Sequence, residues 1–377
     1  MTRLRGSAIL LLLLVCGAAS YGANIHVPLL ELITRAVLSE GVLSLTTRGN
    51  IDMAIGGGYK FGGQIGLSYQ GTELEKGTAA TSAGEDEVKA LIFKSAGVTI
   101  SDILSLPLSF SYFVGESDGF CSGDIFTALY GSAPIATKYR GFVYFPSGPE
   151  YEGMHVVTGT GLKVDVRLAQ DALLLSTYAY QDSNISATED ISGHYSVDLK
   201  ALLNTEKLKL EAFVGVTYPI STYGYYRGGV LFYAADEGVE FLTQLGIPKW
   251  DPAAGNFGIE LFYLLFEPRL HLGIFSIIPT FFWQPKYYLN KDEGMSGSFD
   301  VNLNMRLGNI QESPISAGIE ANLAFRREGA QQITVKGSPY ASFVTPGIVW
   351  DIKIDVKAWP FSLANLLEGY IRIEAAF

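Results

Sequence analysis

The sequence predicts an all-β protein, a closed antiparallel transmembrane β-barrel of about 14 to 16 strands. Three observations lead to this prediction. Apolar and polar residues alternate with period two along most of the chain, and several alternating runs reach ten or more residues. No segment after residue 20 offers the roughly 18 uncharged apolar residues of a transmembrane helix.

Composition agrees with a β-rich chain in an apolar environment. The 377 residues include 42 glycines, 21 tyrosines and 22 phenylalanines, and only 17% are charged. A mean hydropathy of +0.22 is high for a soluble protein. The net charge of −11 argues against a broad basic surface and therefore against nucleic acid as a partner.

Residues 1–23 have the features of a cleaved signal peptide. Arg3 and Arg5 precede an apolar core at residues 8–15. Small residues at 17–23 provide a cleavage zone, so the cut is expected between about residues 19 and 23.

The two cysteines bear on export in different ways. Cys16 offers an alternative interpretation, the lipidated cysteine of a bacterial lipoprotein, although Val15 before it fits that signal poorly. Once residues 1–23 are removed, Cys121 is the only cysteine, so no disulfide within the chain is expected.

Residues 24–41 are predicted to form an amphipathic segment, a short helix ahead of the barrel. Pro28 suits the first turn of this helix and Gly41 its end. Two roles stay open: the helix plugs or lines the lumen, or its apolar side packs in the mouth of the barrel.

The barrel itself is expected over residues 42–377. Apolar residues take every second position in its clearest runs, and polar or charged residues lie between them. These runs cover residues 43–55, 65–69, 195–199, 208–216, 299–307, 315–325, 350–358 and 371–377.

Strand length favours a membrane over water. Soluble antiparallel sheets also alternate, but their strands average about 5 to 6 residues, whereas about 9 to 11 tilted residues cross a bilayer core. No long helices are predicted to cover so many apolar faces. A closed barrel in lipid satisfies every backbone group and leaves no open edge.

Residues 257–283 are too apolar to alternate cleanly. We expect a hairpin that turns at Glu267, Pro268 and Arg269, because Pro268 and Pro279 argue against a helix. A strand that is apolar on both sides is expected to be covered by neighbouring lumen side chains, by a plug, by a partner subunit or by a hydrophobic ligand.

The polar faces of the clearest strands predict the lumen lining. Positive and negative charges are nearly balanced there, so the net charge of the chain does not predict a cation-selective pore. The lumen-facing candidates are Lys207, Lys209, Glu211, Asp300, Arg306, Glu320, Arg326, Asp351, Lys353, Asp355, Lys357, Arg372 and Glu374.

No catalytic site, metal site or cofactor is predicted. Residues His194, Ser196, Asp198 and Lys200 share one face of a strand, but side chains two apart on a strand point in parallel. They are therefore interpreted as part of a polar lumen wall. Paired cysteines, nucleotide loops and zinc-binding motifs are not found in the sequence.

With this signal peptide, this alternation and its last strand, the chain resembles bacterial outer-membrane β-barrel proteins of the porin-like class. The last strand alternates to an aromatic terminus, with Ile371, Ile373, Ala375 and Phe377 on one face. In that class such a strand is similar to the signal that the barrel-assembly machinery reads. The resemblance implies location in the outer membrane, contact with its lipids and a possible homo-oligomer.

The expected function is a pore for passive diffusion of small solutes. Two alternatives stay open. One is a transporter of hydrophobic molecules that uses residues 24–41 and 257–283 as a ligand path. The other is a non-conducting structural or surface-interaction barrel whose lumen is blocked by its own charges.

Overall fold

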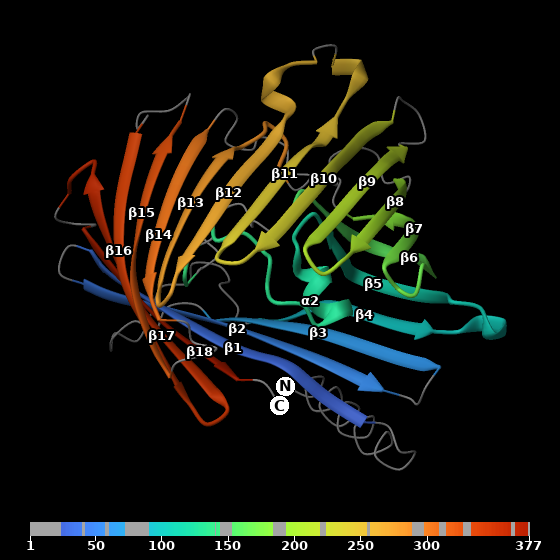
Figure 1. Cartoon of the computed structure of the whole chain (residues 1–377), viewed down its shortest axis with the longest axis horizontal. Helices are drawn as coiled ribbons and strands as arrows, with labels where there is room; N and C mark the ends of the chain where they lie inside the picture. Colours follow the sequence, from blue (N-terminus) through green and yellow to red (C-terminus); the bar gives the residue numbers. More distant parts are fainter. Residues whose placement is uncertain are drawn as a thin grey trace, which may run out of the picture.

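The structure is a computed structural model in which one sheet of 18 strands forms the described part of the chain (Figure 1). It describes residues 24–39, 42–56, 60–71, 90–139, 141–143, 153–183, 194–218, 224–254, 257–288, 298–308, 314–326, 333–362 and 366–375. The strands are β1 (Asn24–Ser39), β2 (Val42–Gly56), β3 (Phe61–Gly71), β4 (Ala90–Ile100), β5 (Leu108–Phe120), β6 (His155–Leu168), β7 (Leu173–Asp182), β8 (Tyr195–Asn204) and β9 (Leu208–Tyr218). They continue with β10 (Tyr225–Asp236), β11 (Val239–Trp250), β12 (Tyr263–Leu272), β13 (Phe275–Trp283), β14 (Phe299–Leu307), β15 (Ile315–Phe325), β16 (Ile333–Thr345), β17 (Ile348–Trp359) and β18 (Leu367–Ala375). The helical turns are η1 (Ile103–Ser105), α2 (Asp124–Tyr130), η2 (Pro252–Ala254) and η3 (Ile259–Leu261).

The sheet closes on itself. Each strand pairs in antiparallel fashion with the next, and β18 returns to β1, where Leu32 lies opposite Ile373 and Thr34 opposite Ile371. The predicted closed antiparallel barrel is confirmed, and so is the pairing of the last strand with the first. The described chain has 18 strands, more than the predicted 14 to 16.

The N-terminal segment differs from the sequence-based prediction. Residues 24–39 form strand β1 instead of an amphipathic helix, and they pair with β2 on one side and β18 on the other. Ile33 is buried while its neighbour Leu32 is exposed, so apolar residues occupy both faces. This two-sided pattern hides the alternation, and pairing on both edges outweighs helix propensity. Residues 40 and 41 lie outside the described residues.

The apolar stretch 257–283 contains the predicted hairpin, but its turn lies elsewhere. Strand β12 continues through residues 267–269, and the chain reverses at Gly273 and Ile274, where Gly273 has a φ of 62°. The β12–β13 ladder is interrupted between Phe266 and Leu270, where its register places Pro268 opposite Pro279. Two prolines without N–H donors explain that gap.

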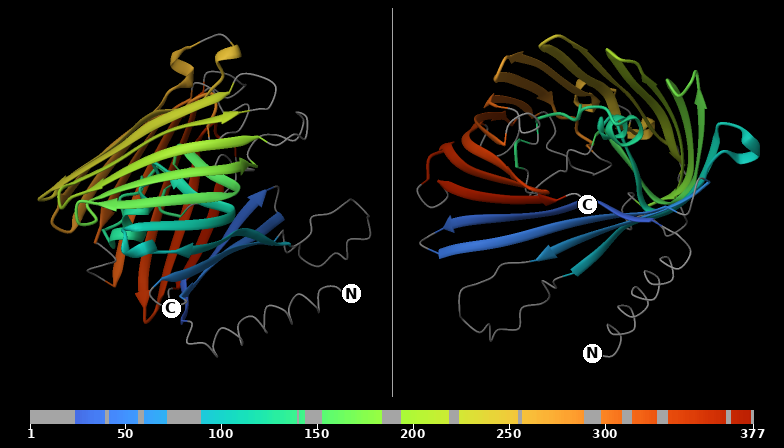
Figure 2. Two further views of the ribbon diagram at one scale, coloured as in Figure 1. Left: turned by 90° about the vertical axis from the view of Figure 1, so that its right-hand side faces the viewer. Right: turned by 60° about the horizontal axis from the view of Figure 1, so that its bottom comes forward.

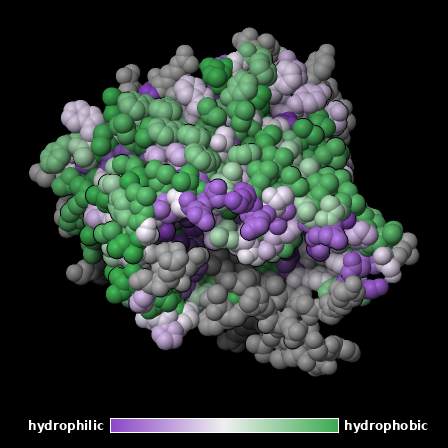
Figure 3. Space-filling view, in the orientation of Figure 1, coloured by the Kyte–Doolittle hydropathy of each residue, from purple (hydrophilic) through white to green (hydrophobic). Residues whose placement is uncertain are grey.

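The outer face of the barrel is apolar. Strand β7 alternates strictly between buried and exposed positions, and large apolar side chains such as Leu175, Leu199 and Val214 are exposed outside. Figure 3 shows apolar surface over β9 to β13 and polar residues along the edge where their short turns lie. Among the described residues, no helix has both the length and the apolar character to cross a bilayer.

The two ends of the barrel differ. One end carries short turns at 169–172, 205–207, 237–238, 273–274 and 346–347, and β1 begins and β18 ends there. The other end carries the longer connections 121–154, 251–262 and 284–298. This difference between the ends is typical of barrels that span the outer membrane.

Candidate functional site in the barrel interior

The connection between β5 and β6 folds into the barrel. We call residues 121–139 and 141–143 of this connection the inner strap. Near its start the strap forms α2, which follows Gly123 at a φ of 88°. The helix ends before Gly131, whose φ of 62° is left-handed, as is common for a glycine after the last residue of a helix. Figure 2 shows α2 enclosed by the ring of strands.

The strap is first fixed to β9 and β11. The backbone N–H of Cys121 donates to Glu211 Oε1 at 2.8 Å, and Gln244 Nε2 donates to the Cys121 carbonyl at 2.7 Å. Tyr263 donates its hydroxyl to Gln244 Oε1 at 2.8 Å. Burial and the Glu211 carboxylate raise the pKa of the Cys121 thiol well above its usual value.

The middle of the strap is held by a buried ion pair on β12. Glu267 accepts hydrogen bonds from the Thr137 hydroxyl at 2.6 Å and the Lys138 N–H at 2.8 Å. Arg269 binds Glu267 at 2.7 Å and donates to two strap carbonyls, those of Ile135 and Ala136, at 3.0 and 2.9 Å. Each charge thus has several partners, which such a buried pair requires.

Lys138 extends this charged region. Burial lowers the pKa of its ammonium group, Arg269 acts in the same direction and Glu267 opposes both. The pKa of Lys138 in the strap therefore depends on two charged residues of β12.

The last part of the strap reaches β14 to β18 and β1. Tyr139 donates its hydroxyl to Asp300, and the Phe142 ring stacks on Tyr340 with ring centroids 4.0 Å apart. Val143 packs beside Ile33 on β1 and Tyr370 on β18. Its carbonyl accepts a hydrogen bond from Lys353 Nζ at 3.4 Å, and Lys353 also pairs with Glu320 at 2.9 Å.

Taken in chain order, these contacts run from β9 to β18 and β1. The strap therefore follows the inner wall over a large part of its circumference. Phe126 and Ile135 join a buried cluster with wall residues such as Phe213 and Phe282. Along these strands, the inward-facing side is filled by strap side chains, and the interior is narrowed.

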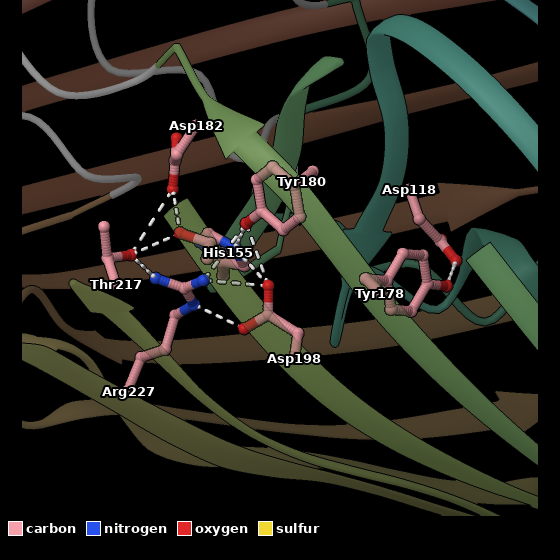
Figure 4. Close-up of polar contacts among 9 residues, drawn as sticks. Asp118, His155, Tyr178, Tyr180, Asp182, Asp198, Thr217 and Arg227 are labelled. Atoms are coloured by element: carbon pink, nitrogen blue, oxygen red, sulfur yellow. Dashed lines mark hydrogen bonds and ion pairs between the residues drawn. The ribbon is translucent and has the colours of Figure 1, made fainter. Parts of the chain in front are cut away.

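A second polar cluster lies within the wall on β6 to β10 (Figure 4). Arg227 donates from Nε and Nη2 to the two oxygens of Asp198 at 2.7 and 2.8 Å, and from Nη1 to Thr217 at 2.7 Å. Tyr180 donates to Asp198 at 2.8 Å and lies 3.1 Å from His155 Nε2. The carboxylate of Asp198 is therefore surrounded by hydrogen-bond partners, an arrangement that fixes these strands.

The cluster also shows how the polar face at residues 194–200 is used. Ser196 donates to Asp182 at 2.7 Å, and Asp198 pairs with Arg227. The imidazole beside Asp198 is that of His155, at 3.6 Å, so His194, Ser196 and Asp198 are not joined in a relay.

The predicted lumen candidates occupy three kinds of position. The buried ones are Lys209, Glu211, Asp300, Glu320, Asp351, Lys353 and Asp355. Those of intermediate exposure are Arg306, Lys357, Arg372 and Glu374. Lys207 and Arg326 are exposed. Lys207 lies in the turn between β8 and β9, where it pairs with Asp236 at 2.8 Å, and so it is not part of the wall.

The predicted assembly residues are only partly described. Ile371 is exposed on the outer face, Ile373 has intermediate exposure and Ala375 is buried. Phe377 lies outside the described residues.

Of the residues that hold the strap, Glu211, Asp300 and Lys353 are among the predicted lumen candidates. Glu267 and Arg269 were expected in a turn because they flank a proline, and the sequence does not indicate that Arg227 and His155 join the wall cluster. The two-residue spacing of Glu267 and Arg269 in an apolar run is the signal that places both on one strand face.

No family model and no curated protein matches the chain. Among solved structures, it is similar to the outer membrane protein OpdK of Pseudomonas aeruginosa, solved with vanillate. The two are 8% identical, the match covers 94% of this chain and 98% of OpdK, and the TM-score is 0.52. It is also similar to Wzi of Escherichia coli, an outer membrane protein involved in group 1 capsule assembly and described as a carbohydrate-binding β-barrel. That match has 10% identity, covers 96% of this chain and 87% of Wzi, and has a TM-score of 0.55.

At such low identity the likeness concerns the fold. The chain has the fold of outer-membrane β-barrels of the porin-like class, as its sequence predicts. A particular family within that class is not identified by sequence.

Proposed function

We propose that the protein is a bacterial outer-membrane pore for passive diffusion of small solutes, narrowed by the inner strap. The observation that carries the proposal is a closed barrel whose interior holds charged side chains and a strap bonded to its wall. Charged groups that face a lumen are typical of water-filled barrels, whereas lipid-facing positions disfavour them. A barrel of 18 strands is wide enough for an aqueous channel.

The route to the membrane is part of the same proposal. Residues 1–23 act as a cleaved signal peptide, and the last strand with Phe377 addresses the chain to the barrel-assembly machinery. In this proposal the apolar outer face contacts outer-membrane lipids, and the barrel associates as a homo-oligomer. The exposed apolar residues on nearly every strand support this placement.

A second candidate, the non-conducting barrel, is favoured by one observation. The strap packs on the wall through two buried clusters, and a blocked lumen would suit a structural or surface-interaction protein. The hydrophobic transporter has less support. Residues 24–39 form a wall strand, and the inward residues Leu265 and Phe282 of the apolar stretch pack in the cluster that holds the strap.

Planar-bilayer recording separates the two candidates. The chain without residues 1–23, refolded in detergent and added to a bilayer in KCl, is expected to give discrete conductance steps. The same protein unfolded by heat serves as the control. A preparation that is folded by circular dichroism and inserts into vesicles without any steps would remove the pore and leave the non-conducting barrel.

A further inference from the structure

A cavity lies between the strap and the inner wall at the long-loop end of the barrel. Its volume is about 340 Å³, within the roughly 300 to 1,000 Å³ typical of small-molecule sites. Tyr139 of the strap forms one side, and residues of β14 to β18 and β1 form the other. We call this space the side chamber.

Most of the charges that line the side chamber are already paired. Arg35 binds Glu368 through two hydrogen bonds of 3.0 and 3.2 Å, and Lys336 binds Asp355 at 2.8 Å. These two pairs neutralise four of the charged side chains around the chamber. These four side chains line the chamber, but their charges are not available to a ligand.

Within the described residues, three charged side chains of the chamber have no ion-pair partner of this kind. Among the described residues, Arg326 and Lys357 have no acidic partner within 4.0 Å, although both line the chamber. Asp300 is 5% exposed. One of its oxygens accepts the Tyr139 hydroxyl, and the other, Oδ1, is buried and has no hydrogen-bond donor among the described residues. Oδ1 of Asp355 also lacks a donor there, but the charge of Asp355 is already matched by Lys336 and by Lys353 at 3.5 Å.

A buried carboxylate oxygen without a donor is unusual in a folded protein and calls for a partner. Within the described part of the chain, the chamber therefore offers two positive groups without an acidic partner and one negative charge, that of Asp300, without a cationic partner within 4.0 Å. A ligand complementary to this set carries a carboxylate and an ammonium group together.

We infer that the side chamber binds small zwitterions of the α-amino acid type. The ligand carboxylate contacts Arg326 and Lys357, and the ligand ammonium group donates to Asp300 Oδ1. This inference rests on the proposed function only in placing the chamber on a solute path, because binding itself needs no conduction.

Other ligand classes fit the chamber less well. A simple anion leaves Asp300 Oδ1 without a donor and meets its negative charge, and a simple cation meets two positive groups. A neutral sugar supplies hydroxyl donors to Asp300 but leaves Arg326 and Lys357 without a counter-charge. Only the zwitterion satisfies all three side chains.

Equilibrium dialysis of the detergent-solubilised protein with radiolabelled solutes tests the inference. L-alanine carries both charges, propionate only the carboxylate and ethylamine only the ammonium group. L-alanine is expected to bind about tenfold or more tightly than either, because each charge-assisted hydrogen bond contributes at about that level. Equal binding of propionate or ethylamine would overturn the inference.

Substitutions assign the contacts. Asp300→Asn is expected to weaken L-alanine binding about tenfold and to strengthen propionate binding, because the negative charge that faces the anion is removed, whereas Arg326→Gln weakens both. Lys207→Gln, in a turn at the opposite end, is the matched control and is expected to change neither. Arg326 is exposed, so Arg326→Gln is expected to fold even if Asp300→Asn does not. Unchanged L-alanine binding in Arg326→Gln contradicts the assignment.

The outcomes also separate this inference from the proposed pore. Selective L-alanine binding by a barrel that shows no conductance would uphold the chamber and reject the pore. Conductance without selective L-alanine binding would uphold the pore and reject the binding of zwitterions in the chamber.

Discussion

At the scale of single residues, the interior is organised by buried charges with several partners each. Glu267 is the centre of this arrangement, because it accepts hydrogen bonds from the strap and from Thr280 at 2.7 Å and also pairs with Arg269. Removing one member of such a pair leaves the other charge buried without compensation. The attachment of the strap to the wall therefore depends on Glu267.

Glu267→Ala is expected to lower the free energy of unfolding by about 3 to 5 kcal/mol, the usual loss when one partner of a buried pair is removed. Urea unfolding of the refolded barrel, followed by tryptophan fluorescence, measures it. Lys207→Gln is the control, since its partner Asp236 is exposed and little change is expected. Equal unfolding midpoints for the two variants would show that Glu267 does not hold the strap.

Cys121 reports on whether the strap stays seated. Its thiol is fully buried and its pKa is raised, so the reactive thiolate is scarce. In the protein without residues 1–23, maleimide labelling at pH 8 is expected to be slow in the folded barrel and fast in urea. In Glu267→Ala it should be faster than in the wild type. Rapid labelling of the folded wild type would mean that the strap leaves the wall.

At the scale of elements, the strands present one side to the outside of the barrel and the other to its interior. In β8, Leu199 is exposed on the outside between Asp198 and Lys200, which are buried. Leu199→Arg is expected to destabilise the barrel in vesicles by about 2 to 4 kcal/mol, the usual cost of arginine near the bilayer midplane. Urea titration of vesicle-inserted protein measures it. Glu206→Arg, in the turn after β8, is the control, and an equal effect there would argue against the membrane placement of β8.

The last strand is expected to govern assembly. Phe377 lies outside the described residues, but β18 closes the barrel by pairing with β1. Deletion of Phe377 is expected to reduce the amount of folded barrel in the outer membrane, while the barrels that do assemble conduct normally. Heat-modifiable mobility in gels measures assembly, and normal yields of folded barrel would remove Phe377 as an assembly signal.

The sequence predicts an element well where the local pattern of residues determines its structure, and poorly where contacts with distant residues do. In strands such as β8 and β14, apolar and polar residues alternate in the sequence itself, because one face of the strand is on the outside of the barrel and the other is in its interior. Strand β1 is apolar on both faces, so its pairing with β2 and β18 is not visible in the segment itself. Glu267 and Arg269 were expected in a turn because they flank Pro268, and the strap that they bind lies far away in the sequence.

The strap was not predicted for the same reason. Its contacts join Cys121 to Glu211 and Val143 to Lys353, and nothing in the local sequence indicates such partners. Of the lumen candidates, those within long alternating runs are mostly buried in the barrel, whereas Lys207, at the end of its run, lies in a turn. Alternation thus shows which side chains share a face of a strand, but not which part of the chain packs on that face.

At the scale of the whole molecule, an apolar outer face, a closed wall and an inner strap together form one narrowed barrel. The wall supplies closure through the β1–β18 pairing, and the strap uses charged wall residues from β9 to β17. The side chamber lies beside the strap at the long-loop end. A solute that crosses the barrel would therefore pass the strap and the chamber together.

Single-channel conductance of two proteins tests the central claim, that the strap narrows a pore. One is the wild-type barrel, and the other carries a glycine-serine linker of equal length in place of residues 124–138. Such a linker stays flexible and makes no wall contacts of its own. We expect small, discrete steps for the wild type and clearly larger steps for the linker variant. Equal steps in both, or a wild-type barrel that inserts and never conducts, would contradict it.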